Sequence, residues 1–380
     1  MKIIHGHVLT MAGKTYEDGF VSFENGKITA VGPMSEAAAV AGEEVFDAEG
    51  GYVLPGFIDA HTHIGVLCES INVAAEFINE MTDPILPHLR IIDGLNPFDT
   101  AIPKAAKAGV TSCVICPGSA NAIGGQTAAI KLHGDSADKM VFKAPCSMKM
   151  ALGDNVRWTY GRDKRVSPMT RMGVAMVIRE AYAQAREYME NKEAGKDVPF
   201  NAKWEALIPV LRKELPVNIH AHRSDDILTA IRIAKEFDLD MRIVHCTDGK
   251  LVGKYMAEAG IPGIVGPALC SSAKQENVNV SMATPASMFR DGVKICITTD
   301  HDVIPLWYLP ICAAVAVREG LDAEEALKAI TINAAEIAGI EDRVGSLEVG
   351  KDADISVFSS HPFDYLTKVK AVYIDGEKVS

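Results

Sequence analysis

The hydrophobic pattern between residues 55 and 344 alternates short apolar runs with longer segments of helical spacing. The runs have the length of buried strands, and the segments between them repeat apolar residues every three to four positions. We predict strands at 57–63, 110–116, 128–132, 142–152, 217–222, 242–246, 261–265 and 294–299. Examples of the predicted helices are 172–191, 202–214, 226–237 and 323–338. This alternation is typical of an α/β fold of the (β/α)8, TIM-like barrel type.

The two ends of the chain follow a different pattern. Residues 2–11 and 27–31 alternate between apolar and polar side chains, and Asn25-Gly26 is a hairpin signal. A short helix is expected at 35–41, and strands recur near the C-terminus at 353–358 and 369–374. The pattern therefore predicts three segments: a barrel at 55–344 between residues 1–54 and 345–380, which together build one small β-sandwich domain.

Composition excludes several kinds of partner. The 380 residues carry a net charge of −12 with no basic stripe, which argues against binding to nucleic acid or to an anionic membrane. No apolar run approaches the roughly 20 residues that a membrane span needs. A small-molecule substrate is therefore expected. The segment 65–107 is a long, proline-bearing insertion after the first barrel strand, which we expect to cover the active face or to serve an interface in a homo-oligomer.

Cysteine usage indicates a reducing compartment. The eight cysteines are scattered, and several lie inside apolar runs, as free buried thiols do. Cys113 and Cys116 have Cys-x-x-Cys spacing within a predicted strand, and no second pair follows, so we assign them no redox or zinc role. Residues 1–4 run directly into polar positions, so no signal peptide is expected and the predicted location is cytoplasmic.

Candidate chemistry begins on the first barrel strand. Side chains alternate along a strand, so Asp59, His61 and His63 point to the same side. Two imidazoles at the end of a strand form half of a metal site. His5 and His7 have the same spacing but lie on what we predict to be a solvated strand, so spacing alone proves little.

Ligand-type residues also end other predicted strands. His220 lies at the end of the fifth strand, His245 ends the sixth, and Asp300 follows the eighth. The carboxyl ends of barrel strands meet at one face, so these side chains are expected to converge with His61 and His63. Nitrogen and carboxylate ligands suit zinc, with manganese or iron as alternatives.

These residues resemble a known family. The matching pieces are 55–63, Pro-Gly-Phe-Ile-Asp-Ala-His-Thr-His, the ends of the fifth and sixth strands, Thr299-Asp300, and 345–354, Gly-Ser-Leu-Glu-Val-Gly-Lys-Asp-Ala-Asp. The chain resembles the amidohydrolase superfamily, on its imidazolonepropionase-related branch, over essentially its whole length. The resemblance implies one or two zinc ions.

The resemblance also implies a role for each ligand. His61 and His63 would hold the more buried metal together with Asp300. His220 and His245 would complete that site or hold a second metal. Asp300 would act as general base, taking a proton from the water that the metal activates and passing it to the leaving nitrogen.

Three further positions have two interpretations each. Lys149, predicted to point into the barrel mouth, would be a metal ligand only if carboxylated, as the bridging lysine is in binuclear relatives; otherwise it would pair with Asp154 or with a substrate carboxylate. His222 shares a face with His220 and would contact the substrate or support the site. Gln126, after two glycines, would bind a substrate amide or carboxylate, or belong to a tight turn.

The predicted function is a metal-dependent hydrolase that cleaves a C–N bond in an amide, a cyclic amide or a dipeptide. A ring deaminase on the same metal site is the alternative, since the same activated water serves both reactions. A non-catalytic scaffold is a third interpretation, which the retained ligands disfavour. The substrate depends on pocket loops that sequence does not resolve.

Overall fold

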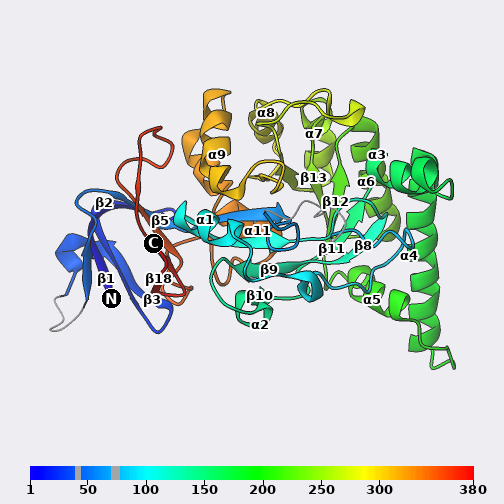
Figure 1. Ribbon diagram of the computed structural model, residues 1–380, viewed down its shortest axis with the longest axis horizontal. Coiled ribbons are helices and arrows are strands. Elements are labelled where there is room, and N and C mark those ends of the chain that lie inside the picture. Colours follow the sequence, from blue (N-terminus) through cyan, green and yellow to red (C-terminus); the bar gives the residue numbers. More distant parts are fainter. Residues whose placement is uncertain (39–43, 70–77) are drawn as a thin grey trace.

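The computed structural model describes residues 1–38, 44–69 and 78–380. A β-rich part lies at one side of the molecule and contains both ends of the chain, and an α/β part makes up the rest (Figure 1). The α/β class is therefore confirmed. Of the expected helix at 35–41, the structure shows a single turn at Met34–Glu36, and positions 39–41 lie outside the described residues.

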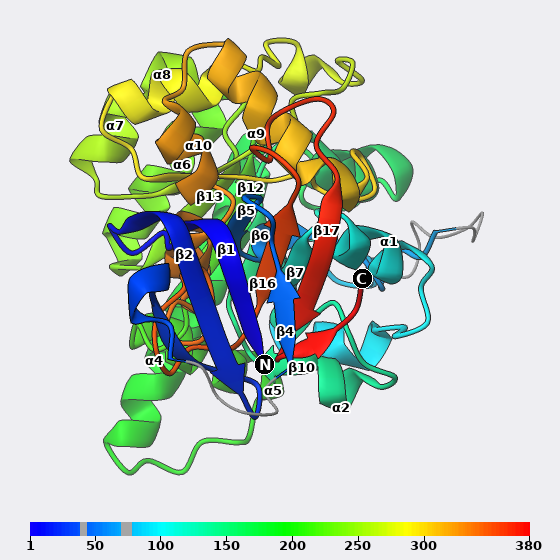
Figure 2. The ribbon, with the colours of Figure 1, turned by 90° about the vertical axis from the view of Figure 1, so that its left-hand side faces the viewer.

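The β-rich part is built from both termini, as predicted, but its described strands form one hydrogen-bonded sheet and not the two sheets of the expected β-sandwich. Its order is β18-β17-β16-β5-β1-β2-β3, with β4 also paired to β1. Figure 2 shows the N-terminal and C-terminal strands side by side. The strands are β1 (Lys2–Leu9), β2 (Thr15–Glu24), β3 (Lys27–Pro33), β4 (Val45–Asp47), β5 (Tyr52–Pro55), β16 (Ile355–Phe358), β17 (Val369–Ile374) and β18 (Glu377–Lys378). Asn25-Gly26 turns the β2–β3 hairpin, in which Glu24 pairs with Lys27.

The α/β part contains two further sheets. The first has the order β10-β9-β7-β6, and the second has the order β15-β14-β13-β12-β11-β8. The strands of the first are β6 (Phe57–Thr62), β7 (Val110–Ile115), β9 (Ala128–Lys131) and β10 (Val141–Lys143). Those of the second are β8 (Ile123–Gln126), β11 (Met148–Ala151), β12 (Val217–Ala221), β13 (Met241–His245), β14 (Gly263–Val265) and β15 (Ile295–Ile297). From β11 to β15 all neighbours are parallel.

Hydrogen bonds connect these two sheets on both sides. Thr127, between β8 and β9, donates its N–H to Ser147 O at 2.9 Å and accepts from Cys146 N at 2.9 Å. On the other side, Thr298 Oγ1, just after β15, donates to His61 O in β6 at 2.6 Å. The carboxyl ends of β6 and β15 are thereby held next to each other.

Helices cover the outside of these sheets (Figure 1). They are α1 (Ala101–Lys107), α2 (Ala137–Met140), α3 (Asp154–Arg157), α4 (Arg171–Glu193), α5 (Ala202–Leu211), α6 (Ser224–Phe237), α7 (Gly249–Glu258), α8 (Thr284–Arg290), α9 (Leu309–Arg318), α10 (Ala323–Lys328) and α11 (Ile332–Ala338). No helix among the described residues has the length and apolarity that crossing a bilayer requires. All eight cysteines are free.

The middle of the chain corrects the prediction of eight parallel strands. The predicted third strand, observed as β9, runs antiparallel to β7, and β8 was expected as a loop but pairs antiparallel with β11. The predicted strand 142–152 is two strands, because β10 pairs with β9 and β11 pairs with β12. The residues of β9 and β11 are buried on both faces, so an apolar run there gives no signal of strand direction.

The predicted helix 323–338 is also two helices. It is interrupted at 329–331 because two backbone carbonyls there leave the helix to accept hydrogen bonds from β15 and β6. Ala329 O accepts from Ile297 N at 3.0 Å, and Ile330 O accepts from Ile58 N at 2.8 Å. Alanine-rich spacing alone predicts a continuous helix here, so tertiary hydrogen bonds override local propensity.

Candidate functional site

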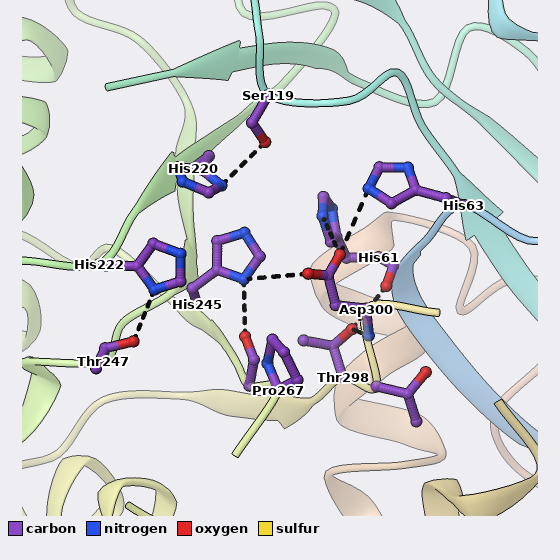
Figure 3. A network of polar contacts seen from close by, with 12 residues as sticks. His61, His63, Ser119, His220, His222, His245, Thr247, Pro267, Thr298 and Asp300 are labelled. Carbon is purple, nitrogen blue, oxygen red and sulfur yellow. Dashed lines mark hydrogen bonds and ion pairs between the residues drawn. The ribbon is translucent and has the colours of Figure 1, made fainter. Parts of the chain in front are cut away.

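One carboxylate meets two histidines at the carboxyl ends of β6 and β15. Asp300 Oδ1 lies 3.4 Å from His61 Nε2 and 3.4 Å from His63 Nε2 (Figure 3). Ligand atoms about 2.0 Å from a tetrahedral zinc ion are about 3.3 Å apart, so each of these two distances suits a pair of ligands on one ion. His61 ends β6, as the alternation of side chains predicted, and Asp300 follows the short strand β15.

Buried hydrogen bonds hold this group in place. Asp59 Oδ2 accepts from Thr299 N at 2.8 Å and from Thr299 Oγ1 at 2.7 Å, and Asp59 Oδ1 accepts from His61 N at 3.0 Å. Asp59 therefore fixes the backbone on each side of the shared centre. His63 Nδ1 donates to Cys116 O at 2.8 Å, which leaves Nε2 to face Asp300.

Three more histidines form a neighbouring group. The ring centroids of His220, His222 and His245 are 4.3–4.7 Å apart. His220 Nδ1 shares a hydrogen bond of 2.9 Å with Ser119 Oγ, and His222 Nδ1 shares one of 2.7 Å with Thr247 Oγ1. His245 Nδ1 donates to Gly266 O at 2.8 Å and lies 4.0 Å from Asp300 Oδ2. In each ring Nδ1 has a partner, so Nε2 is the nitrogen left for a ligand role.

The structure shows two contributors that sequence reasoning missed. Glu276 is 1% exposed, and its Oε1 lies 3.8 Å from His220 Nε2 and 3.9 Å from His222 Nε2. It comes from a short helical turn, Gln275–Asn277, in a polar loop whose sequence resembles solvated surface. Cys116 Sγ lies 3.3 Å from His61 Nδ1. Its position directly after β7, beside β6, was the available signal.

The remaining predicted residues divide between the site and the rest of the fold. Lys149 is fully buried with Nζ 3.3 Å from His61 Nε2, while Asp154 binds Arg157 and Arg171 instead. Gln126 lies opposite Met148, at the amino-terminal end of β11, so the structure does not bring it to the histidines. The described part of the insertion 65–107 contacts the loop that carries Ser119, because Gly118 N donates to Ile78 O at 2.8 Å.

Burial and charge separate the histidines into two kinds. Burial lowers the pKa of His220 and of His245 well below the ordinary value, and it lowers the pKa of His222 to about 4. These three imidazoles are therefore neutral and keep a free electron pair. Although burial opposes it, the charges of Cys116 and Asp300 raise the pKa of His63 to about 9. The group around Asp300 thus attracts positive charge.

Unsatisfied atoms show that the residues fit a metal ion. Among the described residues, His220 Nε2, His245 Nε2 and Asp300 Oδ1 are buried without a hydrogen-bond partner. Each such atom costs roughly 1–3 kcal/mol, which a cation in contact with it would offset. Ligand atoms within 4.8 Å of one another occur in three groups of described residues: His61, His63 and Cys116; His61, His245 and Asp300; and His220, His222 and His245. The donors are those that zinc prefers.

An α/β fold with histidines and an aspartate gathered at the carboxyl ends of its strands defines a class of hydrolases with metal sites. The comparisons identify the family within that class. The family model described as "Amidohydrolase family" matches residues 52–379, and the chain belongs to this family.

Named relatives cover most of the chain. It is 30% identical over 94% of its length to "Amidohydrolase tasK" of Hapsidospora irregularis, although it spans only 39% of that protein. It is 24% identical, over 93% of its length and 89% of the relative, to "Imidazolonepropionase" of Symbiobacterium thermophilum. The solved structure of an amidohydrolase from Thermotoga maritima MSB8 is 42% identical, with a TM-score of 0.94 over 100% of this chain and 99% of that one.

Proposed function

We propose that this protein is a metal-dependent hydrolase that cleaves a C–N bond in a small amide, cyclic amide or dipeptide. One observation carries the proposal: Asp300 Oδ1 is buried, has no hydrogen-bond partner in the part of the chain that the structure describes, and stands 3.4 Å from the Nε2 atoms of both His61 and His63. Such a carboxylate is placed both to hold a metal and to exchange a proton beside it. A structural aspartate would have its oxygens satisfied by donors, as Asp59 has.

The site residues would divide the reaction between them. His61, His63 and Asp300 would hold a metal, and His220 and His245 would complete the site. Zinc, manganese or iron in such a site lowers the pKa of water and polarises a carbonyl. Asp300 accepts the proton of the water as its oxygen bonds to the carbonyl carbon. The same carboxyl group then gives that proton to the nitrogen as the C–N bond breaks, which yields a carboxylate and an amine.

The fold supports this arrangement through a closed barrel, which we infer from the two sheets of the α/β part. Thr127 connects them on one side, and the bond from Thr298 Oγ1 to His61 O connects them on the other. A closed barrel presents its active site at the carboxyl ends of its strands, where the histidines and Asp300 meet. In this barrel β8 and β9 stand antiparallel to their neighbours.

The substrate class is tested with a panel. Cyclic amides belong in it because curated imidazolonepropionases are similar over most of the chain, and an imidazolone is a cyclic amide. Linear amides, dipeptides and aminated rings complete it, so that ring deamination, the alternative from the sequence, has its own readout in released ammonia with the ring intact. Lys149 is measured separately, because intact mass under mild conditions shows whether its amine has gained a carboxyl group.

The decisive comparison is between the metal-loaded enzyme and Asp300→Asn. The control is Asp93→Asn, because Asp93 is exposed and its ion pair in the described structure is with Arg90. Hydrolysis of a panel member is expected to fall by about 100-fold or more in Asp300→Asn, the range for loss of a general base, and to be unchanged in Asp93→Asn. Equal rates in Asp300→Asn and the wild type would refute the proposal. A wild-type chain that retains no metal after dialysis would instead support a scaffold.

A further inference from the structure

Cys116 contacts both histidines of β6. It follows β7 directly and is 1% exposed, and its N–H donates to Thr62 O at 3.1 Å, so its backbone is fixed to β6. Its carbonyl oxygen accepts from His63 Nδ1 at 2.8 Å. Its sulfur lies 3.3 Å from His61 Nδ1, 3.8 Å from His61 Nε2 and 3.8 Å from His63 Nδ1. One residue therefore meets the Nδ1 side of both rings.

The opposite side of the same two rings faces Asp300. Asp300 Oδ1 is 3.4 Å from Nε2 of each ring, and Figure 3 shows the contacts of both rings ending on this carboxylate. His61 and Asp300 also belong to a group with His245, in which the ligand atoms lie within 4.8 Å of one another. His245 is 3% exposed, and its Nε2 has no hydrogen-bond partner in the described chain. The unmet bonding capacity is thus on the side away from Cys116.

The partner of Nδ1 decides which nitrogen of a neutral imidazole can bind a metal. A carbonyl oxygen can only accept, so His63 carries its proton on Nδ1 and keeps the electron pair of Nε2 free. For His61, the hydrogen-bond partner of Nδ1 among the described residues is the sulfur of Cys116, which can also accept. With its proton directed at this sulfur, His61 presents the electron pair of Nε2 to the same point as His63.

We infer that Cys116 is the positioning residue of the histidines on β6: its sulfur accepts the Nδ1–H of His61 while its carbonyl oxygen accepts that of His63. The sulfur acts through His61 and is not itself a metal ligand, because it lies closer to Nδ1 of that ring than to Nε2. The inference rests on the proposed function for the metal itself. It adds a residue to which the Cys-x-x-Cys spacing with Cys113 gave no role.

The test measures the cobalt affinity of the full chain. Protein freed of metal by chelator and dialysis is titrated with Co²⁺ against a competing chelator of known affinity, and the absorption spectrum reports the ligands of the bound ion. Two variants differ by one hydroxyl group. Cys116→Ala removes the acceptor, and Cys116→Ser replaces it with the kind of group that His220 and His222 have at Nδ1. Both variants keep the backbone carbonyl that holds His63.

The matched control is Cys113→Ala. Cys113 lies in β7 and is 0% exposed, and its sulfur has no hydrogen bond among the described residues. A buried sulfur is thus lost in Cys113→Ala and in Cys116→Ala alike, whereas the contact with His61 is lost only in the second. If Cys116→Ala does not fold, Cys116→Val takes its place, because valine fills the space of the sulfur without an acceptor.

We expect Cys116→Ala to bind its tightest cobalt ion about 10- to 100-fold more weakly than the wild type, the range for losing the partner of a ligating histidine. Cys113→Ala should bind cobalt as the wild type does. Cys116→Ser should recover most of the lost affinity, which packing would not explain because alanine and serine fill nearly the same space. The wild type should lack the near-ultraviolet sulfur-to-cobalt band that a thiolate ligand gives.

Unchanged affinity in Cys116→Ala would overturn the inference, and so would an equal loss in Cys113→Ala or a Cys116→Ser variant as weak as Cys116→Ala. A sulfur-to-cobalt band in the wild type would make Cys116 a ligand and would overturn it as well. None of these measurements involves turnover. A failure here is therefore separate from a failure of the proposed hydrolase activity, which the substrate panel decides.

Discussion

A buried ion cluster joins the terminal sheet to the α/β part, and it allows a sharp prediction about stability. Lys131 Nζ, in β9, lies 2.7 Å from Asp354 Oδ1, 2.9 Å from Asp352 Oδ2 and 3.0 Å from Asp375 Oδ1. The side chains of Lys131, Asp354 and Asp352 are at most 3% exposed. Replacing Lys131 by methionine keeps most of the volume and removes the only cation that contacts Asp354 in the described structure.

The expected cost follows from which partners remain. Asp352 keeps Lys27 and Arg343, so its charge stays compensated. Asp354 keeps only the Ser112 hydroxyl at 3.1 Å and Asp375 N at 3.0 Å, neither of which carries charge. A buried carboxylate that loses its cation costs about 3–5 kcal/mol, and we expect Lys131→Met to lower the free energy of unfolding by that amount. Adding Asp354→Asn removes the stranded charge and should restore at least about 1.5 kcal/mol.

Urea unfolding, followed by far-UV circular dichroism and fitted by linear extrapolation, measures these differences. Lys139→Met is the control, because Lys139 and Asp135 form an exposed pair, 68% and 65% accessible, worth at most about 0.5 kcal/mol. Lys131 pairs with Ser112 near the amino-terminal end of β7, away from the site, so turnover per folded molecule should not change. A loss below about 1 kcal/mol, or a double variant no more stable than Lys131→Met, would refute the reasoning.

Three further outcomes are expected. Asp59→Asn should retain the fold but lower kcat/KM for a substrate of the panel by about 100-fold, because the backbone on each side of the metal loses its common anchor; equal kinetics would contradict this. Although burial opposes it, Arg343 and Lys131 lower the pKa of Asp352 from 3.8 to about 2. Asp352→Asn should therefore be less stable than the wild type by a constant amount above pH 3.8, and this difference should vanish as the pH falls through about 2. Acid unfolding curves of both proteins measure it. Chelation should lower the melting temperature, and zinc at 100 times its Kd should restore about 2.7 kcal/mol, an effect that must be absent in a protein without a metal site.

The ends of the strands were the part of the site that sequence could predict. Alternation along 57–63 placed Asp59, His61 and His63 on one face, and the structure brings His61 and His63 to Asp300. The argument needs only a strand, its direction and the rule that parallel strands end at one face. It succeeded for His220 and His245 for the same reason, because β12 and β13 are parallel and in the expected order.

The other site residues could not be predicted from the sequence because they depend on loops and on strand direction. Glu276 reaches the site from a polar turn after β14, and no periodicity distinguishes a buried loop glutamate from a solvated one. Gln126 follows two glycines, and it was expected either to bind a substrate amide or carboxylate or to belong to a tight turn. Because β8 is antiparallel to β11, Gln126 lies opposite Met148 at the amino-terminal end of β11, whereas His220 lies opposite Ala151 at the carboxyl end of β11. Strand direction depends on which neighbour pairs, and a single sequence contains that information only weakly.

The backbone is strained at two residues of the candidate site, Asp300 and His245. Asp300 has φ 51° and His245 has φ 76°, a region that residues other than glycine occupy at a cost. Each is held by contacts from another element: His245 by the carbonyl of Gly266, and Asp300 by the Thr298 hydroxyl, which accepts its N–H at 3.0 Å. Asp300 and His245 connect the two groups of histidines, and these hydrogen bonds hold their strained backbone in place. Such maintained strain is what an arrangement selected for ligand geometry requires.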